Sequence, residues 1–258
     1  MTTLRVQFPV TQWPGWHIPE LTLTSTDQTS LLPSSSSAIT VQVDPKTDSD
    51  YCSDSPVFRA YIKDTLQRQD GTQVVLKFAF REDFVDDLAQ EAEVYRNALE
   101  PLQGSAIPRC YGLFTGEGEE GQEIACLVLE YCGESLDQPF CLLPLDVRMR
   151  ILERLYELHK CGVHHGDFAE RNVLKYNNDI RLIDFDQTEF HDCDCNQTFD
   201  VRPGAKLPRP EDFGCPALWE ICRFEMRIWD ESCDFQEVFY NRKASKIMTS
   251  TSIPISVA

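Results

Sequence analysis

The chain has 258 residues, enough for one domain or a two-lobed unit with a sizeable core. Its formal net charge of -18 argues against nucleic acid as a partner, because phosphate binding needs a basic face. No apolar run reaches the ~18 residues of a membrane span, and the N-terminus lacks the pattern of a secretory signal. We therefore expect an intracellular protein, in cytoplasm or nucleus, that does not enter a membrane and keeps its 11 cysteines reduced.

The first part of the chain is predicted to be poorly ordered. Residues 21–50 are rich in Ser, Thr and Asp and have no helical period, so we expect residues 1–50 to contribute little to the core. Within them only residues 39–43, ITVQV, favour a strand. We accordingly expect the loss of residues 1–40 to leave stability nearly unchanged.

Order is predicted from about residue 51 onward. Residues 56–64 and 73–80 have the extended pattern of two strands, and Asp70-Gly71 between them is a hairpin turn signal. Residues 84–102 predict a helix, and residues 110–132 predict a hairpin with an acidic, glycine-containing loop. The apolar stripe expected on the buried side of this helix consists of Leu88, Ala92, Tyr95 and Leu99.

The second half reads as a helix, a polar loop and a hairpin. Residues 144–163 predict a helix that Asp146 caps and Gly162 ends. Residues 173–176 and 180–183 predict a short hairpin around Asn177-Asn-Asp179. Residues 215–229 predict a last helix that closes the core.

Lys77 stands in the middle of an apolar strand, VVLKFAF. A lysine is costly to bury unless an anion pairs with it, and the next helix offers Glu91 and Glu93. Glu91 falls on or beside the buried stripe, whereas Glu93 falls on the polar side, so the spacing favours Glu91. The alternative is a lysine whose ammonium reaches solvent beside a solvated glutamate.

A second polar cluster, HHGDFAERN, follows the apolar helix at residues 164–172. It contains Asp167 and, five residues later, Asn172, while Asp184 follows the strand RLI. A hairpin between them brings one carboxylate and two further oxygen ligands to one edge. Phosphoryl transfer from ATP needs such a set, namely a carboxylate that orients the attacking hydroxyl and ligands for magnesium.

Taken together, these motifs resemble the eukaryotic protein-kinase superfamily, including its aminoglycoside-phosphotransferase branch. They are especially similar to the kinase-like proteins common in mushroom-forming fungi. The match covers about residues 51–190: VLKF resembles the third-strand lysine motif, EAEVY the next helix, LVLEYC the hinge, HGDFAERN the catalytic loop and DFD the DFG position. It implies an α+β, two-lobed kinase-like fold. We expect a β-rich N-lobe and hinge at 51–132, a shortened helical C-lobe at 133–245 and a disordered tail at 246–258.

The resemblance also implies a role for each site residue. Lys77 would hold the ATP phosphates and pair with Glu91, with Leu129 as gatekeeper and the backbone of Glu130 and Cys132 against adenine. Asp167 would be the catalytic base, with Arg171 beside it at the position of a tyrosine-kinase loop arginine. Asn172 and Asp184 would bind magnesium.

Several positions depart from the kinase pattern. No glycine occurs between Gly15 and Gly71, so the glycine-rich loop over the phosphates is missing. Residues 49–55, SDYCSDS, could fill its place with hydroxyls and amides, but Asp50 and Asp54 would oppose the phosphate charge. Gly166 replaces the arginine of HRD and Asp186 the glycine of DFG, as in small-molecule phosphotransferases.

The cluster His191, Cys193 and Cys195 has residue types that bind zinc. It lacks a second ligand pair at the distance of a zinc finger, which favours an acidic loop with free thiols.

We therefore expect a monomeric, ATP- and Mg²⁺-dependent phosphotransferase that acts on a hydroxyl, slightly favouring a protein acceptor because of Ala169 and Arg171. Two alternatives stay open. One is a pseudokinase, an interaction module without turnover, which the missing glycine-rich loop supports. The other is a small-molecule kinase of the aminoglycoside or choline type, which HGD and the short C-terminal part support.

Overall fold

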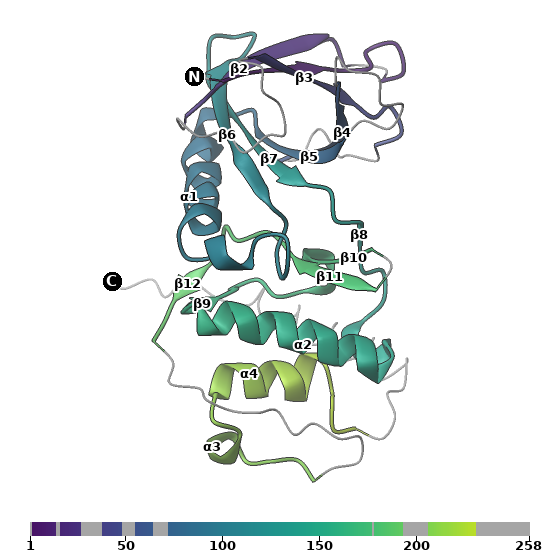
Figure 1. The fold of residues 1–258 in the computed structure, drawn as a ribbon, viewed down its shortest axis with the longest axis vertical. Helices are drawn as coiled ribbons and strands as arrows, with labels where there is room; N and C mark the ends of the chain where they lie inside the picture. The colour runs from purple at the N-terminus through teal and green to yellow at the C-terminus, as the bar shows by residue number, and fades with distance from the viewer. Residues whose placement is uncertain are drawn as a thin grey trace, which may run out of the picture.

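The computed structural model shows a mixed α/β fold that is rich in strands (Figure 1). It describes residues 2–13, 16–26, 38–47, 55–63, 72–176, 178–192 and 206–230. A closed barrel of seven strands forms one end of the molecule, and helices α2 (Leu145–Lys160) and α4 (Pro216–Glu220) lie toward the other. Among these residues no helix has the length and apolar character needed to cross a membrane.

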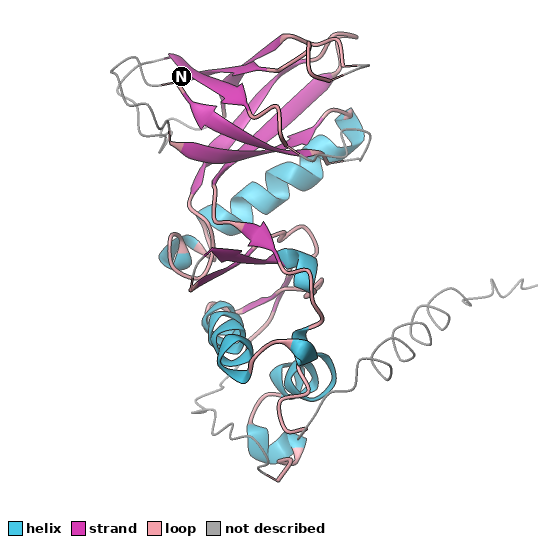
Figure 2. Ribbon diagram, turned by 90° about the vertical axis from the view of Figure 1, so that its right-hand side faces the viewer, coloured by secondary structure: helices cyan, strands magenta, loops and turns pink. Residues whose placement is uncertain are grey.

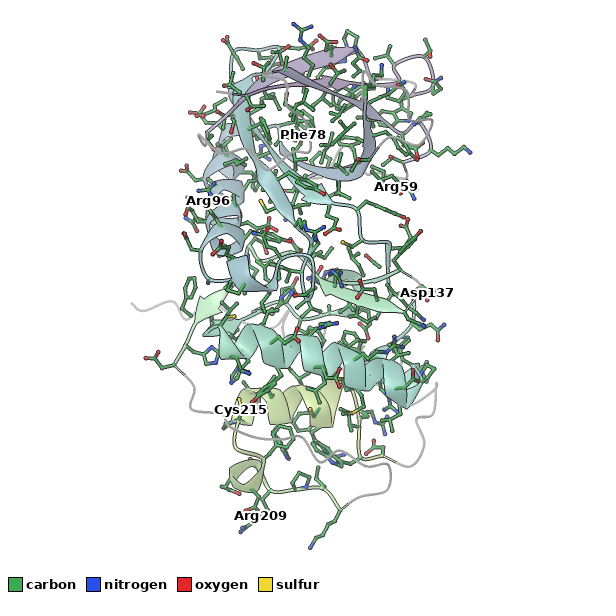
Figure 3. All side chains as sticks on the ribbon, in the orientation of Figure 1. Arg59, Phe78, Arg96, Asp137, Arg209 and Cys215 are labelled. Atoms are coloured by element: carbon green, nitrogen blue, oxygen red, sulfur yellow. The ribbon has the colours of Figure 1, made fainter. Side chains whose placement is uncertain are left out.

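The barrel runs in the order β1-β2-β6-β7-β5-β4-β3. Neighbouring strands are antiparallel, except that β1 pairs in parallel with β3 and so closes the barrel. Apolar side chains alternate inward along the strands and fill the interior, where Figure 3 labels Phe78. The strands are β1 (Thr3–Gln7), β2 (Glu20–Ser25), β3 (Ala38–Val43), β4 (Val57–Ile62), β5 (Gln73–Ala79), β6 (Cys110–Glu117) and β7 (Glu123–Glu130).

The expectation of a poorly ordered N-terminal segment is wrong for the part of residues 1–50 that the structure describes. Strands β1, β2 and β3 all belong to the barrel, and only the strand at 39–43 was expected. The Ser/Thr-rich composition hid a period of two, in which exposed Thr22 and Thr24 alternate with buried Leu21 and Leu23. Threonine is β-branched and suits a strand that is exposed on one face. The same burial argues against a dispensable N-terminus.

Helix α1 (Val85–Arg96) packs on β6 and β7, outside the barrel. Glu91 lies on its buried side and is only 1% exposed. The apolar stripe predicted from the sequence is confirmed for Leu88, Ala92 and Tyr95, which are buried on the helix. The helix ends at Arg96 rather than near residue 102, so Leu99 is also buried but lies beyond it.

Beyond the barrel, two short sheets lie between β7 and α2, as Figure 2 shows along the long axis of the molecule. The predicted hairpin is confirmed as β10 and β11, although Asn177 and the Asp70-Gly71 turn lie outside the described residues. Gly162 follows α2 with φ +74, as expected of a residue that ends a helix. Asp146 is not the cap, because Pro144 precedes the helix and Asp146 lies in its first turn. The strands are β8 (Glu134–Ser135), β9 (Val163–His164), β10 (Val173–Tyr176), β11 (Asp179–Leu182) and β12 (Glu189–Phe190).

The helix predicted at residues 215–229 is present, but it is irregular and ends before residue 229. Helix α4 continues into a π-helical turn, η5 (Ile221–Glu225), and the chain then bends so that Met226 and Trp229 are buried. Arg148 of α2 fastens this bend, its Nη1 donating to Met226 O at 2.8 Å. Residues 231–258, including the predicted tail, lie outside the described residues. The remaining short helices are α3 (Pro210–Phe213), η1 (Glu82–Phe84), η2 (Glu100–Leu102), η3 (Phe140–Leu142) and η4 (Glu170–Asn172).

The barrel closure is open to a direct stability test. Leu23 of β2 is fully buried, so Leu23→Ala should lower the free energy of unfolding by roughly 2–5 kcal/mol. Thr22→Ala, one residue away on the exposed face, should cost less than about 1 kcal/mol. Urea denaturation of both variants measures the difference. Equal, small losses would show that β2 does not pack in the barrel.

Candidate active site

A cavity of about 540 Å³ lies between the barrel and the α2 region. Strands β4, β5 and β7 line its barrel side, and the segment after β9, strand β10 and the residues after β11 line the other side. The residues that border it include Thr47, Ser55, Val57, Val75, Lys77, Glu91, Leu129, Glu130, Tyr131, Glu134, Arg171, Asn172, Leu174 and Asp184.

Lys77 reaches this cavity because strand residues alternate between two faces. Its neighbours Leu76 and Phe78 are fully buried in the barrel, so the lysine points outward from the barrel and into the cavity. Its Nζ donates to Glu91 Oε2 at 2.7 Å and to Asp184 Oδ1 at 2.6 Å. The predicted pairing with Glu91 is confirmed, whereas Glu93 contacts Arg96 at the surface.

This triad is largely shielded from water, since the side chains of Lys77 and Glu91 are 12% and 1% exposed. Burial alone would lower the Lys77 pKa, but the carboxylates of Glu91 and Asp184 outweigh it and raise that pKa above its ordinary value. Burial raises the pKa of the Glu91 carboxyl, while Lys77 and the Phe185 N–H act against that change. Lys77 is therefore a firmly protonated cation at the cavity wall.

The residue after Asp184 holds this segment in place by packing and hydrogen bonding. Phe185 is buried between the rings of Tyr95 and His165, each with its centroid 5.2 Å away. The Phe185 N–H donates to Glu91 Oε1 at 3.3 Å, so both carboxylate oxygens of Glu91 are engaged. Asp184 itself adopts φ 71, a left-handed conformation that aspartate tolerates better than most residues. This backbone turn lets its carboxylate meet Lys77.

Asn172, on the opposite wall, is joined directly to Asp167. The Asn172 Nδ2 donates to Asp167 O at 2.8 Å and to Asp167 Oδ2 at 3.1 Å. Arg171 Nη2 donates to both carboxylate oxygens of Asp167, at 2.6 and 2.5 Å. The Ile183 N–H donates to Asn172 O at 3.1 Å, which ties this loop to the segment of Asp184. The predicted metal ligands Asn172 and Asp184 thus border one cavity, whereas the predicted base Asp167 does not line it but is bonded to Asn172 and Arg171, which do.

Gly166 has a structural reason to be glycine. Its φ is +75, and a Cβ added there would lie 1.8 Å from Gln187 O, a backbone atom. The chain after Asp184 therefore crosses directly over Gly166. The glycine of HGD, whose resemblance to small-molecule phosphotransferases the sequence showed, is thus required by this crossing.

Of the three predicted hinge residues, two line the cavity. Leu129 faces Val75 across β7 and β5, and Glu130 also borders the cavity. Cys132 is buried and does not line it, while its neighbour Tyr131 does. The cavity's apolar walls were missed from sequence: Val57 and Val75 on the barrel side and Leu174 on the other. Val75 stands two residues from Lys77 on the same strand, so strand alternation was the available signal there.

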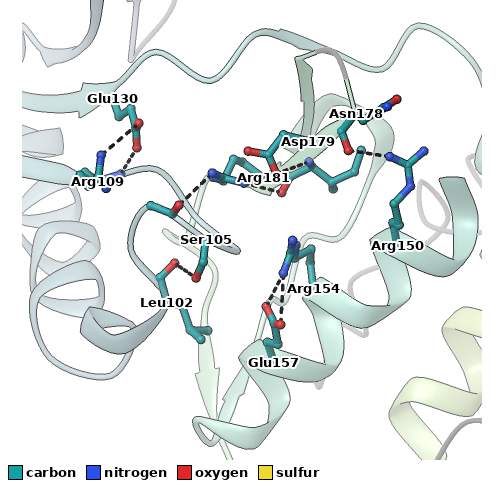
Figure 4. A network of polar contacts seen from close by, with 12 residues as sticks. Leu102, Ser105, Arg109, Glu130, Arg150, Arg154, Glu157, Asn178, Asp179 and Arg181 are labelled. Atoms are coloured by element: carbon teal, nitrogen blue, oxygen red, sulfur yellow. Dashed lines mark hydrogen bonds and ion pairs between the residues drawn. The ribbon is translucent and has the colours of Figure 1, made fainter.

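A polar network on the α1 side holds the two parts of the molecule together (Figure 4). Arg181 of β11 is nearly buried, and its Nη2 donates to Gly104 O at 2.9 Å, while it also pairs with Asp179. Nearby the Leu182 N–H donates to Ala106 O at 2.9 Å. These bonds connect β11, which leads to Asp184, with the connection that follows α1.

This site fits Mg²⁺ only when a bound substrate supplies further oxygen ligands. The described residues contain no group of three or more His, Cys, Asp or Glu side chains placed to hold a metal ion. Asn172 and Asp184 both offer oxygen at the cavity, and Mg²⁺ is commonly held by one or two protein oxygens together with substrate phosphates. The predicted pair fits that requirement.

The predicted zinc-type cluster is only partly visible, since Cys193 and Cys195 lie outside the described residues. His191 approaches His159 instead, with 3.3 Å between their Nε2 atoms. The Cys215 Sγ lies 3.2 Å from the same His159 nitrogen. Burial, with His191 and His164 nearby, lowers the pKa of His159 to about 4. His159 is therefore a neutral imidazole that packs α2 against β12 and α4.

No protein-family model and no curated protein matches this chain.

His159 should make the protein acid-sensitive. Between pH 6.5 and about 4 the unfolded chain protonates this histidine and the folded chain does not, so the free energy of unfolding falls as pH falls. In His159→Gln that contribution is absent. The stability difference between wild type and variant should shrink from pH 7 toward pH 4.5 in urea titrations. Parallel curves would contradict the assignment.

The crossing over Gly166 predicts a second stability effect. Gly166→Ala should be destabilising by several kcal/mol, because the methyl group meets a backbone oxygen in addition to the cost of a left-handed alanine, roughly 1–2 kcal/mol. Gly121→Ala is the matched control, since Gly121 has φ +80 but its nearest neighbour lies 3.4 Å from the added Cβ. Denaturation of both separates the clash from the strain. Equal losses would mean that the chain after Asp184 does not press on Gly166.

Proposed function

We propose that this chain is an ATP-dependent phosphotransferase that transfers the γ-phosphate to a hydroxyl group. The observation that carries the proposal is Lys77, a largely shielded cation between Glu91 and Asp184, which borders the same cavity as Asn172, the residue bonded to Asp167. Phosphoryl transfer is catalysed mainly by positioning and charge stabilisation, and this set supplies both.

The cavity has an apolar part that suits the base of a nucleotide and a charged part that suits its phosphates. Val57 and Val75 on one side and Leu174 on the other offer apolar surfaces for a purine base, beside the connecting backbone at residues 130–133. Lys77 would hold the phosphates. Asn172 and Asp184 would hold Mg²⁺, which neutralises charge on the phosphate oxygens.

Asp167 would act on the acceptor. Its carboxylate orients the hydroxyl and takes its proton as the oxygen attacks the γ-phosphorus and the bond to the β-phosphate oxygen breaks. Arg171, which contacts both oxygens of Asp167, orients that carboxylate and would place a positive charge near the transferred group. Protein and small-molecule hydroxyls both remain acceptors under this proposal.

The arrangement supports a two-lobed kinase-like fold for this protein. In that interpretation the barrel with α1 is the N-lobe, and α2 with β8 to β12 begins a short C-lobe. The N-lobe would start near residue 3 rather than residue 51, because β1 to β3 are part of the barrel.

A pseudokinase is the second candidate, and one observation favours it. Arg171 already occupies both oxygens of Asp167, and the cavity lacks a glycine-rich roof. Such a protein would bind nucleotide without turnover and act through its surface.

Three variants separate these functions. We expect Asp167→Asn to lower MgATP turnover by ~10²–10⁴-fold while nucleotide affinity stays near wild type. Lys77→Met should weaken nucleotide affinity itself, since it removes the phosphate-facing cation. Glu93→Gln, on the same helix as Glu91 but at the surface, should change neither and serves as control.

Calorimetric binding of MgATP and measurement of ADP release, with protein and small-hydroxyl acceptor panels, give the two readouts. Wild-type binding without turnover would identify the pseudokinase. Wild type that neither binds nor turns over MgATP would contradict both candidates.

A further inference from the structure

The turn of residues 44–47, called the roof from here on, follows β3 and contains no glycine. Thr47 of this turn and Ser55, two residues before β4, both line the cavity. In the turn the Thr47 N–H donates to Asp44 O at 3.0 Å and the Lys46 N–H donates to Asp44 Oδ1 at 2.9 Å. Pro45 stands inside the turn and restricts its backbone.

Strand β4 holds this turn from one side. The Arg59 N–H donates to Thr47 Oγ1 at 3.2 Å, and the Asp44 N–H donates to Arg59 O at 2.8 Å. The Tyr61 hydroxyl reaches Asp44 Oδ2 at 3.2 Å. The turn is therefore joined to the same strand that carries Val57 into the cavity.

The N-terminal segment holds the turn from the other side through Trp13. Its indole Nε1 donates to Pro45 O at 3.1 Å, across 32 residues of chain. Its ring stacks on Phe58, with centroids 5.6 Å apart and 24° between the planes. Phe58 is the chain neighbour of Val57, so Trp13 contacts the support of the roof at two points. The ring is 8% exposed, which leaves it little freedom to move.

We propose that Trp13 is a positioning residue for the nucleotide, because it sets the roof of the cavity by tertiary contact. A glycine-rich loop approaches phosphates through its own backbone freedom. This chain has instead a preorganised turn whose place is determined by Trp13 and β4. The inference rests on the proposed function, since it assigns the roof to MgATP.

The test compares Trp13→Phe with Trp16→Phe. Both keep an aromatic ring in the same cluster, but Trp16 donates its indole N–H to Ile18 O within its own segment. Loss of the Trp13 hydrogen bond should weaken MgATP binding about fivefold, the factor expected from one such bond, and raise KM more than it changes kcat. Trp16→Phe should stay within about twofold of wild type.

Trypsin cleavage after Lys46 gives a readout that needs no nucleotide. Lys46 is exposed in the turn, and cleavage there should accelerate in Trp13→Phe and not in Trp16→Phe. Thr47→Val removes the bond from Arg59 without touching the barrel interior, so it tests the roof even if Trp13→Phe unfolds. It should weaken MgATP binding in the same direction.

The outcomes distinguish the two proposals. If wild type binds MgATP but Trp13→Phe and Thr47→Val bind it equally well, the role of Trp13 is overturned and the proposed function stands. If unfolding leaves only Thr47→Val measurable, unchanged MgATP affinity in that variant overturns it as well. If wild type does not bind MgATP, both proposals fail, and faster cleavage after Lys46 in Trp13→Phe would then show a structural role alone.

Discussion

The arrangement of the cavity depends on one cation, Lys77, that is largely shielded from water. A lysine in a low-dielectric wall must have anionic partners, and Lys77 takes one from α1 and one from the segment after β11. Helix α1 and the segment after β11 are far apart in the chain, and their contacts with the same lysine hold them close together in space. The second carboxylate oxygen of Glu91 accepts a hydrogen bond from the Phe185 N–H, and the Phe185 ring packs against that of His165. The position of Lys77 is therefore coupled to both residues. Electrostatics and packing thus act on the same few residues.

The barrel fixes the position of Lys77. Because β5 is paired on both sides, its residues face either the barrel interior or the outer side of the barrel, where Val75 and Lys77 line the cavity. Phe78 and Leu76 hold the strand inward, which commits Lys77 outward. The hairpin of β1 and β2 completes the ring, so the rigidity of the cavity wall depends on residues far from it in sequence.

Local patterns predicted much of the site, and long-range pairing explains what they missed. Glu91 was found because helical spacing separates it from Glu93, and the β10–β11 hairpin because its strands are adjacent in sequence. The parallel contact of β1 with β3 has no local signature, and the Ser/Thr-rich composition concealed the alternation of Leu21 and Leu23. The need for glycine at 166 was likewise invisible, because it arises from a backbone oxygen of Gln187.

The closed barrel also has a consequence for the order of folding during synthesis. The hairpin of β1 and β2 leaves the ribosome before β6, but β6 is the partner of β2, and Thr24 pairs with Thr115 across 91 residues. Until β6 is made, β2 presents an unpaired edge with alternating leucines, a surface that can associate with other chains. Closure of the ring is thus a late, non-local event and a slow one by topology. The time that translation takes between β2 and β6 therefore determines how long this edge stays without its partner strand.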